Sequence, residues 1–273
     1  STSTPLRLSR RVPAADIMGF CSCLCCGLCF CCSSAKRFFH CISAATIATA
    51  IIFAALSLGG SEGNALAWSY AKLKVTDNGF PSDCVRDFSF GLISFTTKLL
   101  GCGSADTESS KRYDSDSCSA TLSMFGVSAN SLCDQCRDAG LVTDFFTALA
   151  CLVGSLAFGM VVCRMFDKGD DPCKRWTTGM LLFSMFIMLV VAWATWMAEC
   201  QPEIDNYIDN LANKDMHDGK DVSQISTGTY LVFFATLFTL GALIIECAIQ
   251  CRGDDDGKAT GAVEMKEETK EVA

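Results

Sequence analysis

Four long apolar stretches constrain this chain more than any other feature. Their apolar cores are residues 41–58, 145–162, 176–197 and 230–249, and none has a charged residue in its middle. A helix of about 20 apolar residues matches the ~30 Å hydrocarbon core of a bilayer. Such a helix also satisfies its own backbone hydrogen bonds there. The sequence therefore predicts an all-α membrane protein, a four-transmembrane helix bundle with segments at 38–58, 145–163, 176–198 and 230–250.

Composition and charge narrow the function. Half of the 273 residues are hydrophobic, which fits a multi-pass membrane protein and argues against a soluble enzyme. The net charge is −8 and no basic stripe is present, so we expect no nucleic-acid partner. His40 and His217 are predicted on opposite sides of the membrane, and no catalytic grouping is evident. We expect no enzymatic activity, no small-molecule substrate, no catalytic or metal site, and no cofactor other than covalent lipid.

The basic residues predict the orientation. The short connection 164–175 carries four Lys or Arg residues, whereas the longer connection 199–229 carries two. Short basic connections stay in the cytoplasm. We therefore place the N-terminal segment 1–37 and the tail 251–273 in the cytoplasm, and 59–144 and 199–229 outside, in a plasma-membrane protein. The polar composition of the tail predicts disorder.

The predicted outer loops hold an even number of cysteines. Six thiols in an oxidising compartment allow three disulfides, and fifteen pairings remain open. Two of them form a CxxC, but no second pair or nearby His completes a zinc site, so we favour structural disulfides. The large loop is thus predicted to be a small, disulfide-stapled, β-rich domain. The candidates are Cys84, Cys102, Cys118, Cys133, Cys136 and Cys200.

A second cysteine cluster precedes the first span. Cytosolic cysteines beside a membrane span are the usual acceptors of S-palmitoylation, and each buried CH₂ of an acyl chain contributes about 0.8 kcal/mol. The alternatives are a metal site, for which the cysteines are too crowded, and a plain apolar extension of the span. We favour acylation. The candidates are Cys21, Cys23, Cys25, Cys26, Cys29, Cys31 and Cys32.

Two further features of the cytoplasmic side have alternative interpretations. Met18 looks like a natural start, so residues 1–17 are either upstream read-through, which we favour, or a basic extension. Four cysteines at the inner ends of the later spans are acylated or are ordinary small apolar residues, and we favour the latter. They are Cys163, Cys173, Cys247 and Cys251.

Small residues in the first two spans predict close helix packing. Pairs of small residues four apart let helix backbones approach each other, so we expect the first two spans to form the tight centre of the bundle. The pairs are Ala44 with Ala48, Ala150 with Gly154, and Ser155 with Gly159.

Three other residues of the spans carry predictions. Trp193 and Trp196 are expected at the outer membrane interface as an aromatic belt. Glu246 lies near the inner end of the last span; it either pairs with Arg164 or Arg252 or, as we favour, lies at the level of the headgroups.

The large outer loop has strand signals. Residues 68–75 and 87–95 alternate between apolar and polar side chains, which predicts two strands, and residues 77–79 supply a turn. Residues 103–117 are rich in Ser, Asp and charged side chains, so we expect a flexible excursion there.

The layout resembles the claudin and peripheral-myelin-protein superfamily, whose first outer loop carries a W…GLW…C…C pattern. Trp68 is placed like the first Trp, and Gly91, Leu92 and Ile93 are placed like the GLW core. Ile93 replaces the family's Trp, and Cys102 comes later than the family spacing. The resemblance implies a left-handed bundle crowned by a small antiparallel sheet.

The resemblance also implies a function. Members of this superfamily polymerise laterally into strands or serve as auxiliary subunits of channels. The expected function is thus a non-enzymatic structural tetraspan that organises plasma-membrane domains, and the alternative is an auxiliary or trafficking subunit of a membrane channel or receptor. The expected partners are membrane lipids and further copies or other membrane proteins. With its cysteine-rich N-terminal segment, the chain also looks similar to four-helix strip proteins of the euglenoid pellicle, which form a cortical array in these protists.

Overall fold

The structure is a computed structural model with two compact units, Ser1–Phe38 and Phe39–Ala273. The predictions for residues 1–17, for the seven N-terminal cysteines, for the turn at 77–79 and for Cys102 lie outside the described residues. The structure describes residues 35–62, 66–74, 84–101, 108–113, 117–166, 172–212 and 223–271.

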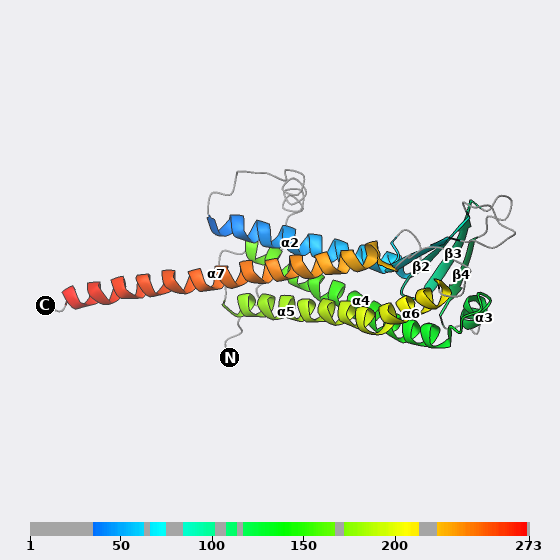
Figure 1. Cartoon of the computed structure of the whole chain (residues 1–273). Helices are drawn as coiled ribbons and strands as arrows, with labels where there is room; N and C mark the ends of the chain where they lie inside the picture. The colour runs from blue at the N-terminus through cyan, green and yellow to red at the C-terminus, as the bar shows by residue number, and fades with distance from the viewer. Residues whose placement is uncertain are drawn as a thin grey trace, which may run out of the picture. The chain divides into compact units, whose positions relative to one another are not determined.

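Within the described residues, four helices are long and apolar enough to cross a membrane, which confirms the four apolar helices of the prediction. They are drawn as α2, α4, α5 and α7 in Figure 1. The third helix continues through a π-helical turn, η3 (Trp196–Cys200), into α6 (Gln201–Leu211). The four bounds are α2 Ala35–Leu58, α4 Asn130–Phe166, α5 Pro172–Thr195 and α7 Thr227–Glu271.

Two helices extend well beyond their apolar windows into regions that we expected to be loop. The early part of α4 buries Leu132, Cys136, Ala139 and Thr143 at helical spacing. Likewise α6 buries Ile204, Tyr207, Ile208 and Leu211. These turns are amphipathic rather than uniformly apolar, so a search for membrane spans misses them.

The last helix also runs further than expected. The structure has helix through Glu271, where the composition of residues 251–273 predicts disorder. The Ala, Glu, Lys and Met residues of this segment have high helix propensity, which accounts for the difference.

A five-stranded antiparallel sheet in the order β4-β3-β2-β1-β5 confirms the small sheet of the prediction. Ser69 pairs with Phe90 on one side and with Ile225 on the other, so the two predicted outer loops share one sheet. The strands are β1 Ser69–Lys74, β2 Val85–Phe90, β3 Ser94–Leu100, β4 Glu108–Arg112 and β5 Gln224–Ile225.

Two strand predictions need correction. The alternating run 87–95 is divided between β2 and β3 by a tight turn, in which the Gly91 amide donates to the Ser94 carbonyl at 2.8 Å. The expected flexible excursion contains β4, whose residue Arg112 pairs with Ser94. Charged and hydroxyl side chains suit such an edge strand because they discourage pairing with other chains, so polar composition does not exclude a strand.

The helix packing differs from the prediction. The most extensive helix pair is α4 with α5, followed by α5 with α7, rather than the first two spans. The reason is the stripe of buried residues that α5 presents along its whole length, including Leu182, Met185, Leu189 and Ala192. Small residues on α2 permit close approach but do not by themselves create an interface.

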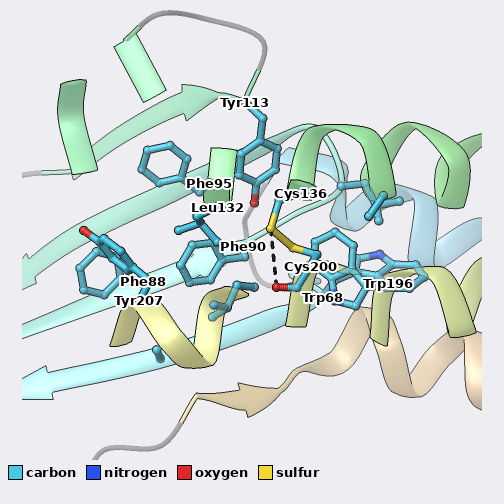
Figure 2. Packing of buried hydrophobic residues seen from close by; sticks show 14 of the residues in the cluster. Trp68, Phe88, Phe90, Phe95, Tyr113, Leu132, Cys136, Trp196, Cys200 and Tyr207 are labelled. Atoms are coloured by element: carbon cyan, nitrogen blue, oxygen red, sulfur yellow. Dashed lines mark hydrogen bonds between the residues drawn. A yellow bond between two sulfur atoms is a disulfide. The ribbon is translucent and has the colours of Figure 1, made fainter. Parts of the chain in front are cut away.

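Aromatic side chains fill the space between the sheet and the helices (Figure 2). Phe88 contacts Tyr207 of α6 edge-on, with ring centroids 6.4 Å apart. Phe95 stacks with Tyr113 at 5.9 Å. Phe90 lies between these pairs, 6.2 Å from Phe88 and 6.4 Å from Phe95. This cluster fixes the sheet on α4 and α6.

Candidate functional site

Trp68 occupies the junction between the sheet and the helices, and its side chain is fully buried. Its indole Nε1 donates to the Ser57 carbonyl of α2 at 3.1 Å. Its backbone amide donates to the Phe90 carbonyl at 2.8 Å, and its carbonyl accepts a hydrogen bond of 2.7 Å from the Thr229 hydroxyl of α7. One residue therefore joins the first helix, the sheet and the last helix.

Two glycines make room for this residue. A Cβ on Gly60 would lie 1.9 Å from the Leu66 carbonyl oxygen, and a Cβ on Gly228 would lie 2.7 Å from Cδ1 of Trp68. Both approaches are closer than any side-chain carbon tolerates, so these positions require glycine. The sequence analysis missed both residues, although a glycine just after the first apolar span and another just before the last one are a signal that it could have used.

Trp196 corrects the predicted aromatic belt. Its side chain is fully buried rather than exposed at an interface. It lies 5.5 Å from Trp68 between ring centroids, and its Nε1 donates to the Ser69 hydroxyl at 3.1 Å. Trp193 is half-buried and packs on Phe233 of α7. Burial with a satisfied N–H is the ordinary core role of an indole.

A polar chain continues from this point. The Ser69 hydroxyl donates to Gln201 Oε1 at 2.6 Å, and Gln201 Nε2 donates to the Ser223 hydroxyl at 2.8 Å. The Ser223 hydroxyl in turn donates to Asp205. Because each buried polar group finds a partner, this chain ties β1 to α6 and to the segment before β5.

The turn at residues 91–93 binds the sheet to α4. Leu92 is buried, and a Cβ on Gly140 of α4 would lie 1.8 Å from its carbonyl oxygen. The Tyr113 hydroxyl donates to the Gly91 carbonyl at 3.2 Å, and burial raises the pKa of Tyr113. Ile93 is partly exposed, at 37%. Of the four motif residues, Trp68, Gly91 and Leu92 are thus structural, whereas Ile93 faces outward.

Two disulfides confirm a structural role for the CxxC cysteines. Cys118 of α3 (Ser117–Ser123) bonds Cys133 of α4, and Cys136 of α4 bonds Cys200 of η3. The two cysteines of the CxxC therefore take different partners. Cys84 is also disulfide-bonded. The sheet end of the molecule is thus covalently joined to α4.

Glu246 is buried between the helices of the bundle. Its side chain is fully buried, and Oε2 accepts a hydrogen bond of 2.7 Å from Arg164 Nη1 of α4. The other carboxylate oxygen accepts a hydrogen bond of 2.8 Å from the Ser43 hydroxyl of α2. The pairing with Arg164, one of the two alternatives, is therefore correct. We call Arg164 and Glu246 the inner ion pair, and the Ser43 hydroxyl is its third partner.

The predicted packing residues divide into two groups. Ala44, Ala150 and Gly154 are buried, and a Cβ on Gly154 would lie 2.7 Å from the Met185 sulfur and 3.0 Å from Ile51. Ala48 is half-buried. The pair Ser155 and Gly159 is exposed on α4, and a Cβ on Gly159 would meet no atom within 4 Å.

Among the residues that the structure describes, no group of three or more His, Cys, Asp or Glu side chains is placed to hold a metal ion. Fold and site together define a protein with four apolar helices that suit a membrane and a disulfide-bonded sheet at one end. No protein-family model matches the chain, and a comparison with curated proteins gives no match either.

Proposed function

We propose that this chain is a non-enzymatic structural tetraspan that self-associates laterally into strands or arrays and thereby organises plasma-membrane domains. The sheet faces outward and both termini lie in the cytoplasm. The disulfides at the sheet end support this orientation because such bonds persist in oxidising compartments. The basic connection at the other end of the helices agrees with it.

The observation that carries the proposal is the outward face of α4. Leu141, Phe145, Leu152 and Leu156 are 58%, 61%, 62% and 56% exposed, and their spacing places them on one side of the helix. Ser155 and Gly159 lie on that same side. The contact between Gly140 and the Leu92 carbonyl brings the partly exposed Ile93 next to the outer end of this face.

Lipid tails are as apolar as Leu, so apolar exposure alone does not drive association within a membrane. Small residues four apart do favour it, because they let a second helix approach closely and gain dispersion contacts. Among the described residues, a Cβ on Gly159 would meet no atom within 4 Å, and Ser155 is exposed. A second copy is the partner that this face fits, and repetition of the contact would build a row.

The claudin-like kinship belongs to the same proposal. Its support is the small antiparallel sheet at one end of the helices, which the resemblance implies. N-terminal acylation is part of it too. Replacing the seven N-terminal cysteines by Ser should lower the number of hydroxylamine-sensitive acyl groups per chain, and an unchanged number would contradict acylation there.

Freeze-fracture imaging of membranes that express only this chain tests the function. We expect rows or lattices of particles from the native protein and dispersed particles from Gly159→Leu. Ala55→Leu is the matched control, because Ala55 is an exposed small residue on α2, and it should leave the rows intact. Rows that persist in Gly159→Leu would show that α4 is not the contact. Scattered native particles that alter another protein's currents would favour the auxiliary-subunit alternative.

A further inference from the structure

The last helix is attached to the rest of the bundle by polar contacts near both ends of its apolar span. At the outer end, the Thr229 hydroxyl donates to the Trp68 carbonyl at 2.7 Å. At the inner end, Glu246 accepts from Arg164 and Ser43. These attachments are seventeen residues apart in α7, which is about 25 Å along a helix and close to the ~30 Å hydrocarbon thickness.

Between these attachments, the aromatic contacts of α7 lie toward its outer half, where Phe233 packs on Trp193, and Phe234 and Phe238 pack on Phe53 of α2. The buried residues of this stretch are Val232, Ala235, Thr239 and Ala242, and the Thr239 hydroxyl donates to its own helix at Ala235. In the inner half of α7, the buried side chain nearest to Glu246 within this stretch is that of Ala242. A small side chain permits close approach of a neighbouring helix, but it offers few atoms that would block rotation. Packing therefore restricts rotation or sliding of the inner half of α7 less than that of the outer half.

The inner ion pair supplies the missing constraint. The two hydrogen bonds that Glu246 accepts come from different helices, since Arg164 belongs to α4 and Ser43 to α2. A carboxylate that must meet both partners, with both charged side chains fully buried, accepts one rotation and one axial position of α7. A displacement by one helical turn, about 5.4 Å, would separate the charges in a medium where that is costly.

We propose that the inner ion pair is a register pin, which fixes the rotation and height of α7 against α2 and α4 and thereby sets where the helix leaves the bundle. Buried ion pairs contribute little net stability compared with apolar residues of similar volume, whereas selection of one register is their best-attested use. The pin acts within one copy of the chain and does not depend on lateral association.

The test uses the full chain with nitroxide labels on Cys163 and Cys247, the exposed neighbours of Arg164 and Glu246. The seven N-terminal cysteines, Cys41, Cys151, Cys173 and Cys251 are replaced by Ser to keep labelling specific. The native protein should give one narrow distance distribution. In Arg164→Met/Glu246→Leu, the distribution should broaden at least two-fold or divide, while the disulfides of the sheet end still form.

Two controls distinguish a role in fixing the position of α7 from a general contribution to the stability of the fold. Labels on Leu141→Cys and Tyr230→Cys report the outer halves of α4 and α7, both side chains being exposed, and their distribution should stay narrow in the apolar double variant. The exchanged pair Arg164→Glu/Glu246→Arg should narrow the inner distribution again. An apolar double variant that keeps the narrow inner distribution overturns the proposal. One that fails to fold also overturns it, because the pair would then serve stability.

Discussion

The two ends of this molecule are stabilised in different ways. The sheet end combines an aromatic cluster, a chain of hydrogen bonds and the disulfides Cys118–Cys133 and Cys136–Cys200. At the other end of the helices, Glu246 accepts hydrogen bonds from Arg164 of α4 and Ser43 of α2. Where many contacts support one another, removal of one of them lowers the free energy of unfolding only partly, because the others remain. Removal of the partner of a buried charge lowers it more, because the charge is left unpaired.

The difference reflects the surroundings of each end. In the proposed orientation the sheet end meets water, so the hydrophobic effect drives burial of its aromatic surface, and disulfides constrain the unfolded chain. The apolar helices would face lipid, where that driving force is absent, so specificity there would depend on small residues and polar pairs. The following variants test this contrast, from the largest expected effect to the smallest.

The largest effect is expected for Glu246→Leu alone. This variant leaves Arg164 as a buried charge without its carboxylate, and removal of one partner of a buried pair costs about 3–5 kcal/mol. The free energy of unfolding in detergent micelles measures this cost. A loss below about 1 kcal/mol, the range of exposed pairs, would show that water reaches Arg164 and that the inner end is less dry than its burial indicates.

Removing the disulfides should cost slightly less at the sheet end. Chain entropy predicts about 4 kcal/mol for Cys136→Ser/Cys200→Ser and about 3 kcal/mol for Cys118→Ser/Cys133→Ser, because the bonds close loops of 64 and 15 residues. Unfolding of each double variant in micelles checks the order. Equal losses, or the reverse order, would contradict the loop-entropy account.

A further prediction concerns the disulfide formed by Cys84. We expect Cys102 to be the partner of Cys84, because Val85 pairs with Leu100 in the adjacent strands. Peptide mapping without reduction should recover these two cysteines in one linked species. Recovery of Cys84 with any other cysteine would contradict this pairing.

Two glycines of α4 form a matched pair for the next prediction. Gly140→Ala introduces a carbon that overlaps the Leu92 carbonyl oxygen, whereas Gly159→Ala enters open space. Overpacking typically costs about 1–3 kcal/mol, so Gly140→Ala should destabilise the fold, whereas Gly159→Ala should leave it unchanged or stabilise it by up to about 1 kcal/mol, because Ala favours a helix more than Gly does. The fraction of chains that reach the cell surface with intact disulfides reports both. Equal fractions would contradict the close contact between the turn at 91–93 and α4.

The smallest effect is expected for an ion pair of the same chemistry on the sheet surface. Lys98 and Glu108 approach to 3.0 Å, but their side chains are 44% and 60% exposed. Solvent screens such pairs, so Lys98→Met should change the free energy of unfolding by less than about 1 kcal/mol. Unfolding in micelles at low and high salt measures it. A loss comparable to that of Glu246→Leu would remove the distinction between the two ends.

Different sequence patterns predicted the structure to different extents. Long apolar runs located all four helices, and strand alternation located β1. The same alternation in residues 87–95 did not reveal the turn at Gly91, because a two-residue period says nothing about where a strand reverses. The pairing of Cys133 and Cys136 with different partners was equally inaccessible, since disulfide connectivity depends on which elements meet.

Residue chemistry alone was ambiguous where burial decides the role. Trp196 fits an interfacial belt as well as a core, and Glu246 fits the level of the headgroups as well as an ion pair. Gly140 carried no signal in the sequence because its role depends on the Leu92 carbonyl, almost fifty residues away in the chain. The exposed face of α4 was also unforeseen, because Ser155 and Gly159 have the same spacing as the buried pair Ala150 and Gly154.

The sequence by itself determined the number and place of the apolar helices and the presence of strands in the connection between the first two of them, because hydrophobicity and strand alternation are local properties of the chain. Only the tertiary structure decided which helices form the core, that both outer connections share one sheet, and that Arg164 and Glu246 meet inside the bundle. These facts depend on contacts between residues distant in sequence, which no local pattern encodes.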